Sequence, residues 1–134
     1  ERYVKVHPDF RVIFTSNSLE YAGVHRAQDA LLDRMAGIYM DYYDPETETK
    51  IISQQAKIEP KQAGVIANML RTLREKLPEG GGLGTRAGIM VAQALKLNNN
   101  FNEASIKQML GDVLTSKTKS LQHFREQMKI VRKL

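Results

Sequence analysis

The spacing of apolar residues changes about one third of the way along the chain. Before Asp44, residues 10–15 and 37–43 form short apolar runs rich in β-branched and aromatic side chains. Such runs are typical of buried β-strands. Residues 26–35, between them, have apolar side chains at helical spacing. This order predicts strand, helix and strand at the edge of a parallel sheet, whose ligand crevice lies at the carboxyl ends of the strands.

From Asp44 onward, apolar residues recur every three or four positions, which predicts α-helices. Asp44 can cap the first helix, Pro45 suits its first turn, and Glu46 and Glu48 suit its positive end. A further helix is predicted over residues 85–97, after the glycines of residues 80–84. Three other apolar stripes indicate helices: Ile66, Met69, Leu70, Leu73 and Leu77; Ile106, Met109, Leu110, Val113 and Leu114; and Leu121, Phe124, Met128 and Val131.

These patterns predict a chain of two parts. Residues 1–43 are expected to be the end of an α/β core, and residues 44–134 a small helical bundle. The 134 residues, 42% hydrophobic and 26% charged, have the composition of a globular protein. The chain has no cysteine, no apolar run long enough to span a membrane, and no initiator Met. We therefore expect a non-membrane piece of a longer protein from a reducing compartment.

The positive charge is concentrated in the second half of the chain. Residues 1–67 carry 8 basic and 10 acidic side chains, whereas residues 68–134 carry 12 basic and 5 acidic ones. One interpretation is a basic helical module that binds nucleic acid. The other, which we favour, is a set of solvated helix faces, because only Phe124 lies among the C-terminal cations as a stacking aromatic.

The glycine-rich stretch imitates a nucleotide-binding motif. Residues 82–87 fit the pattern G-x-G-x-x-A, but that motif requires a strand upstream, and residues 71–77 have a helical pattern. A P-loop of the form G-x-x-x-x-G-K-[ST] is absent from the sequence. We therefore interpret these glycines as a helix-to-helix loop. No metal site is predicted either, because the histidines lie far apart at His7, His25 and His123.

Three polar residues are the candidate site. Asn17 follows the first predicted strand, where its amide can orient a water or a phosphate. Arg34 lies at the end of the first predicted helix. Arg86 lies in the first turn of a helix, where a cation opposes the helix dipole unless an anion is nearby. Taken singly, each residue is also explained as an ordinary turn or surface residue.

Several stretches resemble the second half of MoxR-type AAA+ ATPases. They are FRVIFTSN at residues 10–17, YAGVH at residues 21–25 and QDALLDR at residues 28–34. The similarity is dense over residues 6–43 and looser in the helical part, where residues 84–87 match the sensor-2 position. Within this family the sequence is most similar to the ATPases of gas vesicle assembly.

The resemblance implies a role for each candidate residue. Asn17 is similar to the sensor-1 residue, which positions the attacking water near the γ-phosphate. Arg34 matches the arginine finger, which reaches the nucleotide of a neighbouring subunit, and Arg86 matches the sensor-2 arginine of a helical lid. The family also implies ATP, Mg²⁺, a homo-oligomeric ring and remodelling of protein partners. Here the implied partners are structural or accessory proteins of the gas vesicle, and the implied location is the cytoplasm, near the vesicle.

The sequence departs from the family because it contains neither the Walker A lysine nor the Walker B carboxylate. We therefore expect this chain by itself to show no ATP turnover, although the full-length protein is expected to be an ATP hydrolase. A MoxR-type ATPase that activates another enzyme by inserting a cofactor or metal is an alternative within the family. The basic nucleic-acid-binding module is the alternative from another class.

Overall fold

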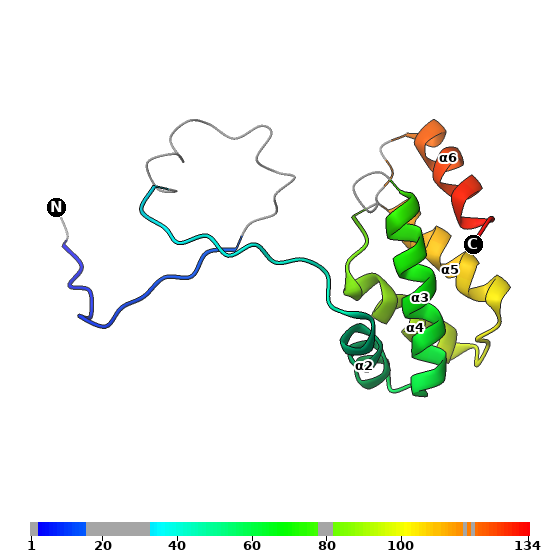
Figure 1. The fold of residues 1–134 in the computed structure, drawn as a ribbon, viewed down its shortest axis with the longest axis horizontal. Helices are drawn as coiled ribbons and strands as arrows, with labels where there is room; N and C mark the ends of the chain where they lie inside the picture. Colours follow the sequence, from blue (N-terminus) through cyan, green and yellow to red (C-terminus); the bar gives the residue numbers. More distant parts are fainter. Residues whose placement is uncertain (1–2, 16–32, 78–81, 117, 119) are drawn as a thin grey trace. The chain divides into compact units, whose positions relative to one another are not determined.

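The computed structural model describes residues 3–15, 33–77, 82–116, 118 and 120–134. It divides into two units, Glu1–Met40 and Asp41–Leu134. The second unit contains every helix found in the described residues (Figure 1). In chain order these are α2 (Pro45–Ala56), α3 (Pro60–Lys76), α4 (Thr85–Leu97), α5 (Glu103–Thr115) and α6 (Leu121–Val131). None of these helices is long and apolar enough to cross a membrane.

Helices α2, α5 and α6 begin where a short polar side chain caps a free N–H group. The carboxylate of Asp44 accepts a hydrogen bond of 2.9 Å from the backbone N–H of Thr47, as the sequence predicts for the start of α2. Hydrogen bonding from the Thr47 side chain, and after it from the Thr47 backbone N–H, lowers the pKa of Asp44 because both stabilise the charged form. Asn102 caps α5 in the same way, and Ser120 caps α6.

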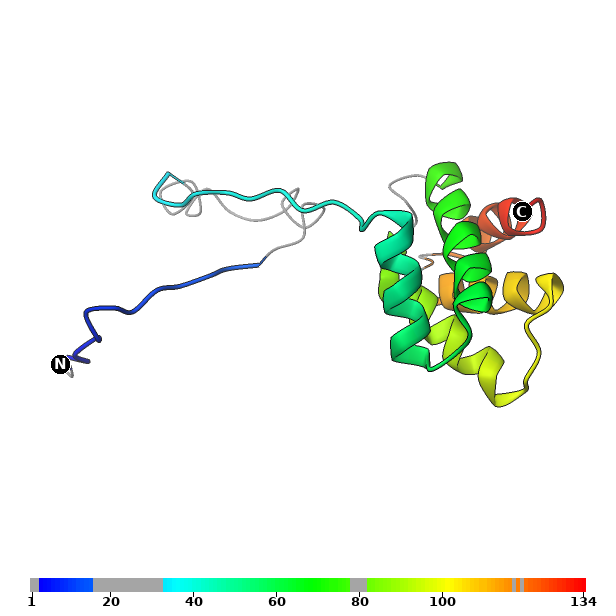
Figure 2. The ribbon, with the colours of Figure 1, turned by 60° about the horizontal axis from the view of Figure 1, so that its bottom comes forward.

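A single apolar core joins the helices. Helix α2 contacts both α3 and α4, α4 contacts α5, and α5 contacts α6 (Figure 2). The stripes predicted for residues 66–77 and 106–114 lie on the buried faces of α3 and α5. The fully buried large apolar side chains are Ile52, Ile66, Leu70, Leu73, Leu83, Val91, Ile106, Leu110, Leu114 and Val131. The predicted helical bundle is therefore confirmed.

Helices α2 and α4 run side by side in the same direction, tied together at both ends. Near their N-termini, Thr85 Oγ1 of α4 donates a hydrogen bond of 2.9 Å to Glu48 of α2. Near their C-termini, Lys96 Nζ of α4 donates to the carbonyl oxygens of Ala56 and Lys57 at 3.2 and 2.9 Å. Between these ties Gly88 allows a close approach, because a Cβ there would lie 2.6 Å from Ile52 Cδ1.

The stripe predicted for the last helix is confirmed except at its first residue, since Phe124 and Met128 are partly buried. Val131 is buried as expected, but Leu121 is 64% exposed. Gln127 is buried instead, and its Nε2 lies 3.0 Å from Nε2 of the partly buried His123. Leu121 is the first residue of α6, and the apolar pattern alone does not show which side chains of a helix its neighbours cover.

The two strands predicted before Asp44 are not found. Residues 10–15 and 37–43 are described, and they have no regular secondary structure. A strand requires a neighbouring strand to complete its backbone hydrogen bonds, and the described residues supply none. The intervening helix predicted over residues 26–35 lies mostly outside the described residues, and Asp33 and Arg34 lie in a turn. The strand–helix–strand unit is thus not confirmed.

Candidate functional site

Arg86 lies where the sequence predicts, in the first turn of α4. Gly84 is the N-cap of this helix and supplies no side-chain hydrogen bond to it. The Arg86 side chain is exposed, and among the described residues no carboxylate forms an ion pair with it. An exposed guanidinium beside the free N–H groups of a helix start offers donors and positive charge to an anion.

The other two candidate residues belong to the first part of the chain. Asn17 lies outside the described residues. Arg34 is described and exposed, in the unit Glu1–Met40. Because the two units are not placed relative to each other, the structure does not bring Arg34 and Arg86 together.

The structure contains a polar cluster that the sequence analysis did not find. Glu48 of α2 is fully buried, and Arg74 of α3 is 7% exposed. Their side chains form a bidentate ion pair, with Arg74 Nη1 2.9 Å from Glu48 Oε2 and Nη2 2.7 Å from Oε1. Arg74 Nε donates a 2.6 Å hydrogen bond to the carbonyl oxygen of Leu83, and Thr85 Oγ1 donates to Glu48 Oε1. The guanidinium carbon of Arg74 also lies 4.1 Å from the ring centre of Tyr42.

We call Glu48, Arg74 and Thr85 the buried triad. Its charges are taken out of water, which is costly unless both are paired and hydrogen-bonded. Here the guanidinium and the carboxylate both meet that condition. The triad therefore joins α2 and α3 to the start of α4. Thr85, its member on α4, directly precedes Arg86.

The sequence does carry a signal for this cluster. Glu48 lies four and eight residues before the buried Ile52 and Ala56, so it continues their stripe. Arg74 lies four residues after the buried Leu70, in the same way. A charge of each sign inside an apolar stripe indicates a buried pair. The position of Glu48 in the first turn instead suggested only an interaction with the positive end of its helix.

The glycine-rich stretch follows a helix, as predicted. Helix α3 extends to Lys76, so no strand precedes the glycines as a dinucleotide motif requires. Residues 78–81 lie outside the described part. Gly82 has a φ of 63°, a left-handed conformation that glycine adopts easily, and Leu83 is fully buried. Leu83 thus anchors the end of this loop in the core.

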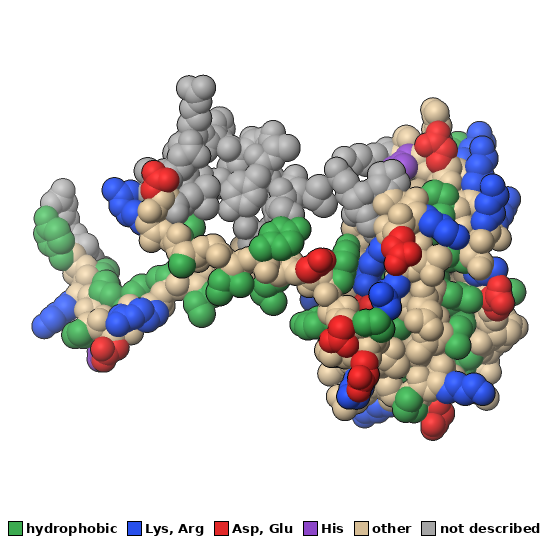
Figure 3. Space-filling view, viewed as in Figure 1, with side chains coloured by type: hydrophobic (Ala, Val, Ile, Leu, Met, Phe, Trp, Pro, Cys, Tyr) green, Lys and Arg blue, Asp and Glu red, His purple; other side chains and the backbone are tan. Residues whose placement is uncertain are grey.

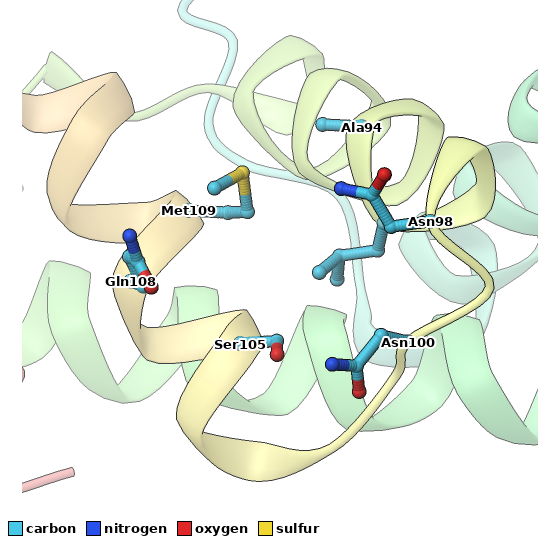
Figure 4. Close-up of a pocket in the computed structure, with 7 residues that line it drawn as sticks. Ala94, Asn98, Asn100, Ser105, Gln108 and Met109 are labelled. Atoms are coloured by element: carbon cyan, nitrogen blue, oxygen red, sulfur yellow. The ribbon is translucent and has the colours of Figure 1, made fainter.

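A cavity of about 190 Å³ lies between α4 and α5 (Figure 4). Leu95 and Met109 provide apolar walls, and the polar groups come from side chains such as Asn98 and Gln108. No charged side chain is among the described residues that line it. A phosphate site usually has a cation or an array of backbone N–H groups, so this cavity is not a candidate for one. Its lining residues are Ala94, Leu95, Asn98, Asn100, Ser105, Gln108 and Met109.

Basic side chains gather over α6 (Figure 3). Arg125, Lys129 and Arg132 are exposed and lie on one helix face. Phe124, the stacking aromatic that the sequence offered, is partly buried. Within the described ranges, no group of three or more His, Cys, Asp or Glu side chains could hold a metal ion.

No family model matches the chain. The chain is, however, similar to curated proteins named ATPases. The gas vesicle ATPase GvpN2 of Halobacterium salinarum is 48% identical over 116 residues, and GvpN of Haloferax mediterranei is 47% identical over 117 residues. GvpN of Ancylobacter aquaticus is 38% identical over 120 residues.

These matches cover 87% of this chain and 33–34% of each of the relatives. The chain thus spans about a third of their length. The similarity confirms the resemblance to gas vesicle ATPases that the sequence predicts.

Proposed function

We propose that this chain is the C-terminal portion of a MoxR-type AAA+ ATPase that uses ATP hydrolysis to remodel proteins during gas vesicle assembly. The observation that carries the proposal is its identity of 38–48% to curated gas vesicle ATPases over 87% of its length. In this proposal residues 1–43 end the α/β core, and residues 44–134 form the helical lid. The partners are structural or accessory proteins of the vesicle, and the protein acts in the cytoplasm as a ring.

The exposed apolar side chains of the first unit support the proposal that it pairs with further strands in the longer ATPase. Val4, Ile13, Ile38, Tyr39 and Met40 are each at least 79% exposed. Large apolar groups in this number are normally covered in a folded protein. In the longer ATPase, preceding strands of the core would pair with residues 10–15 and 37–43 and bury these groups.

Arg86 fits a contact with the phosphates of ATP. It is an exposed cation in the first turn of α4, and no carboxylate of the described residues neutralises it. In the proposed lid it is the sensor-2 residue. As the resemblance implies, the magnesium site of this proposal lies mostly outside this chain.

Asn17 and Arg34 complete the proposed site. Asn17 orients the attacking water as sensor 1, and Arg34 is the finger that reaches the nucleotide of the neighbouring subunit. Hydrolysis of the γ-phosphate develops charge that such a cation stabilises, with an effect of roughly 10³–10⁵ on the rate in related systems.

The proposal is tested by separating nucleotide binding from hydrolysis in the longer ATPase. Arg34→Ala is expected to leave ATP affinity nearly intact and to remove most of the hydrolysis, because its charge acts mainly in the transition state. Arg86→Ala is expected to weaken ATP affinity as well, because a lid residue contacts the phosphates before reaction. Binding of a fluorescent ATP analogue and phosphate release measure the two quantities.

Arg125→Ala is the matched control. Arg125 is an exposed arginine in the same helical unit as Arg86, and the proposal gives it no role. It is expected to change neither quantity. Normal hydrolysis by Arg34→Ala would show that Arg34 is a surface arginine and not a finger.

A further inference from the structure

The start of α4 is held in an unusual way. Its N-cap, Gly84, provides no side chain to satisfy the free N–H groups of the helix. The residues on both sides of Gly84 are anchored instead. The carbonyl of Leu83 accepts the 2.6 Å hydrogen bond from Arg74, and the hydroxyl of Thr85 donates to Glu48 at 2.9 Å.

We propose that the buried triad of Glu48, Arg74 and Thr85 positions Arg86 for its contact with the nucleotide. Glu48 and Arg74 are positioning residues in this sense, since their side chains are buried and act through the residues on either side of Gly84. The inference rests on the proposed function, in which Arg86 is the lid residue that binds the phosphates.

The geometry of the triad makes it a rigid support. The Arg74 guanidinium and the Glu48 carboxylate meet through two parallel hydrogen bonds, an arrangement that fixes both distance and direction. Both groups are almost completely removed from water, so solvent cannot replace the bonds when the helix shifts. Arg86 directly follows Thr85, so its backbone is fixed by the same contacts.

The triad also connects to the segment that enters the helical unit. Tyr42 lies two residues before the N-cap of α2, and its ring stacks at 4.1 Å on the Arg74 guanidinium. The start of α4 is therefore braced against α2, α3 and the entering segment together. A displacement of that segment would reach Arg86 through the contact between Tyr42 and Arg74.

The first test uses the 134-residue chain and needs no ATPase activity. Thr85→Val removes the hydroxyl with little change in shape, and Thr85→Ser retains the hydroxyl. The amide of Ala87, which bonds to the Gly84 carbonyl at 2.9 Å, reports the first turn of α4. We expect hydrogen exchange at Ala87 to be faster in Thr85→Val and unchanged in Thr85→Ser. Thr72→Val, which removes a hydroxyl of α3 bonded only within its own helix, is the control and should leave Ala87 unchanged.

The second test measures nucleotide binding in the longer ATPase. Thr85→Val is expected to weaken ATP affinity by roughly twofold to thirtyfold, the usual range for a residue that acts through a packed network. Thr85→Ser should retain the affinity. In an Arg86→Ala background, Thr85→Val should cause no further loss, because the residue it positions is already absent.

The outcomes separate this inference from the proposed function. If Arg86→Ala weakens binding but Thr85→Val does not, the positioning role is wrong and the function of Arg86 stands. If Arg86→Ala leaves binding unchanged, the sensor-2 assignment is wrong and this inference falls with it. Additive losses from Thr85→Val and Arg86→Ala would also overturn the inference, because the two residues would then act independently.

Discussion

The carboxylate of Glu48 has no exposed surface, and its negative charge is balanced by Arg74 alone among charged groups of the described residues. Removing one partner of such a pair leaves the other buried and uncompensated. Replacing both partners with apolar groups removes both charges together and leaves only the neutral Leu83 carbonyl and Thr85 hydroxyl without their partners. Single and double substitutions at this site should therefore behave very differently.

We predict that Glu48→Ala lowers the free energy of unfolding of the chain by about 3–5 kcal/mol. The double variant Glu48→Leu with Arg74→Met should be less destabilised than Glu48→Ala. Chemical denaturation followed by circular dichroism measures both. Glu46→Ala is the matched control, because Glu46 lies on the same helix and pairs with Lys50 in solvent. It should have little effect, and a loss at Glu46 equal to that at Glu48 would contradict the account.

The residues of the site differ in how far the sequence could predict them. Arg86 could be placed in the first turn of a helix because glycines precede it and apolar residues at helical spacing follow it. The role of Glu48 could not be predicted, because a carboxylate in the first turn can either interact with the helix dipole or form a buried ion pair. Which of the two roles Glu48 has depends on whether Arg74, 26 residues away, faces it. The sequence pattern of α3 alone does not determine that orientation.

At the scale of the elements, close contact between α2 and α4 is what places the start of α4. Gly88 permits this contact, since a Cβ at that position would lie 2.6 Å from Ile52 Cδ1 and 3.2 Å from Leu70 Cδ2. Both neighbours are fully buried and have little room to move. Gly64 on α3 is different, because its nearest contact would be Thr49 Cγ2 at 3.8 Å.

We predict opposite effects for alanine at these two helical glycines. Gly64→Ala should stabilise the chain by about 0.5–1 kcal/mol, the gain in helix propensity. Gly88→Ala gains the same propensity but should be destabilising, because overpacking of a core usually costs about 1–3 kcal/mol. Thermal unfolding of the two variants measures the difference. Equal stabilisation by both would show that α2 and α4 are not in close contact at Gly88.

Helices α3, α5 and α6 could be predicted because each carries an apolar stripe, and α2 and α4 could be predicted from the residues at their starts. The strands at residues 10–15 and 37–43 could not be verified in the same way. A helix completes its hydrogen bonds within its own segment, whereas a strand completes them only with another strand. Leu121 was predicted to be buried and is exposed. An apolar stripe does not by itself show which of its residues a neighbouring helix covers.

At the scale of the whole molecule, the two units should differ in their ability to fold alone. The helical unit has an apolar core of its own, whereas the first unit exposes most of its large apolar side chains. We predict that residues 41–134 unfold cooperatively as a helical protein, and that residues 1–40 alone are unfolded. Residues 45–134 should fold but be less stable, because they lack the Asp44 cap and the Tyr42 ring. A strand-rich circular dichroism spectrum of residues 1–40 would contradict this.

We propose that Arg34 of this chain supplies a cation in trans to a neighbouring subunit of an ATPase ring. Mixing two inactive variants of the longer ATPase tests this claim most directly. One variant carries Arg34→Ala, and the other lacks the lysine of its phosphate-binding loop. In a mixed ring, a subunit with an intact phosphate-binding loop can lie beside a subunit with an intact Arg34.

We predict that the mixture recovers measurable phosphate release, although each variant alone has almost none. Recovery should rise and then fall as the ratio of the two variants is varied, because only mixed neighbours are active. If mixed rings form and no ratio restores hydrolysis, Arg34 does not act across a subunit boundary, and the account is contradicted.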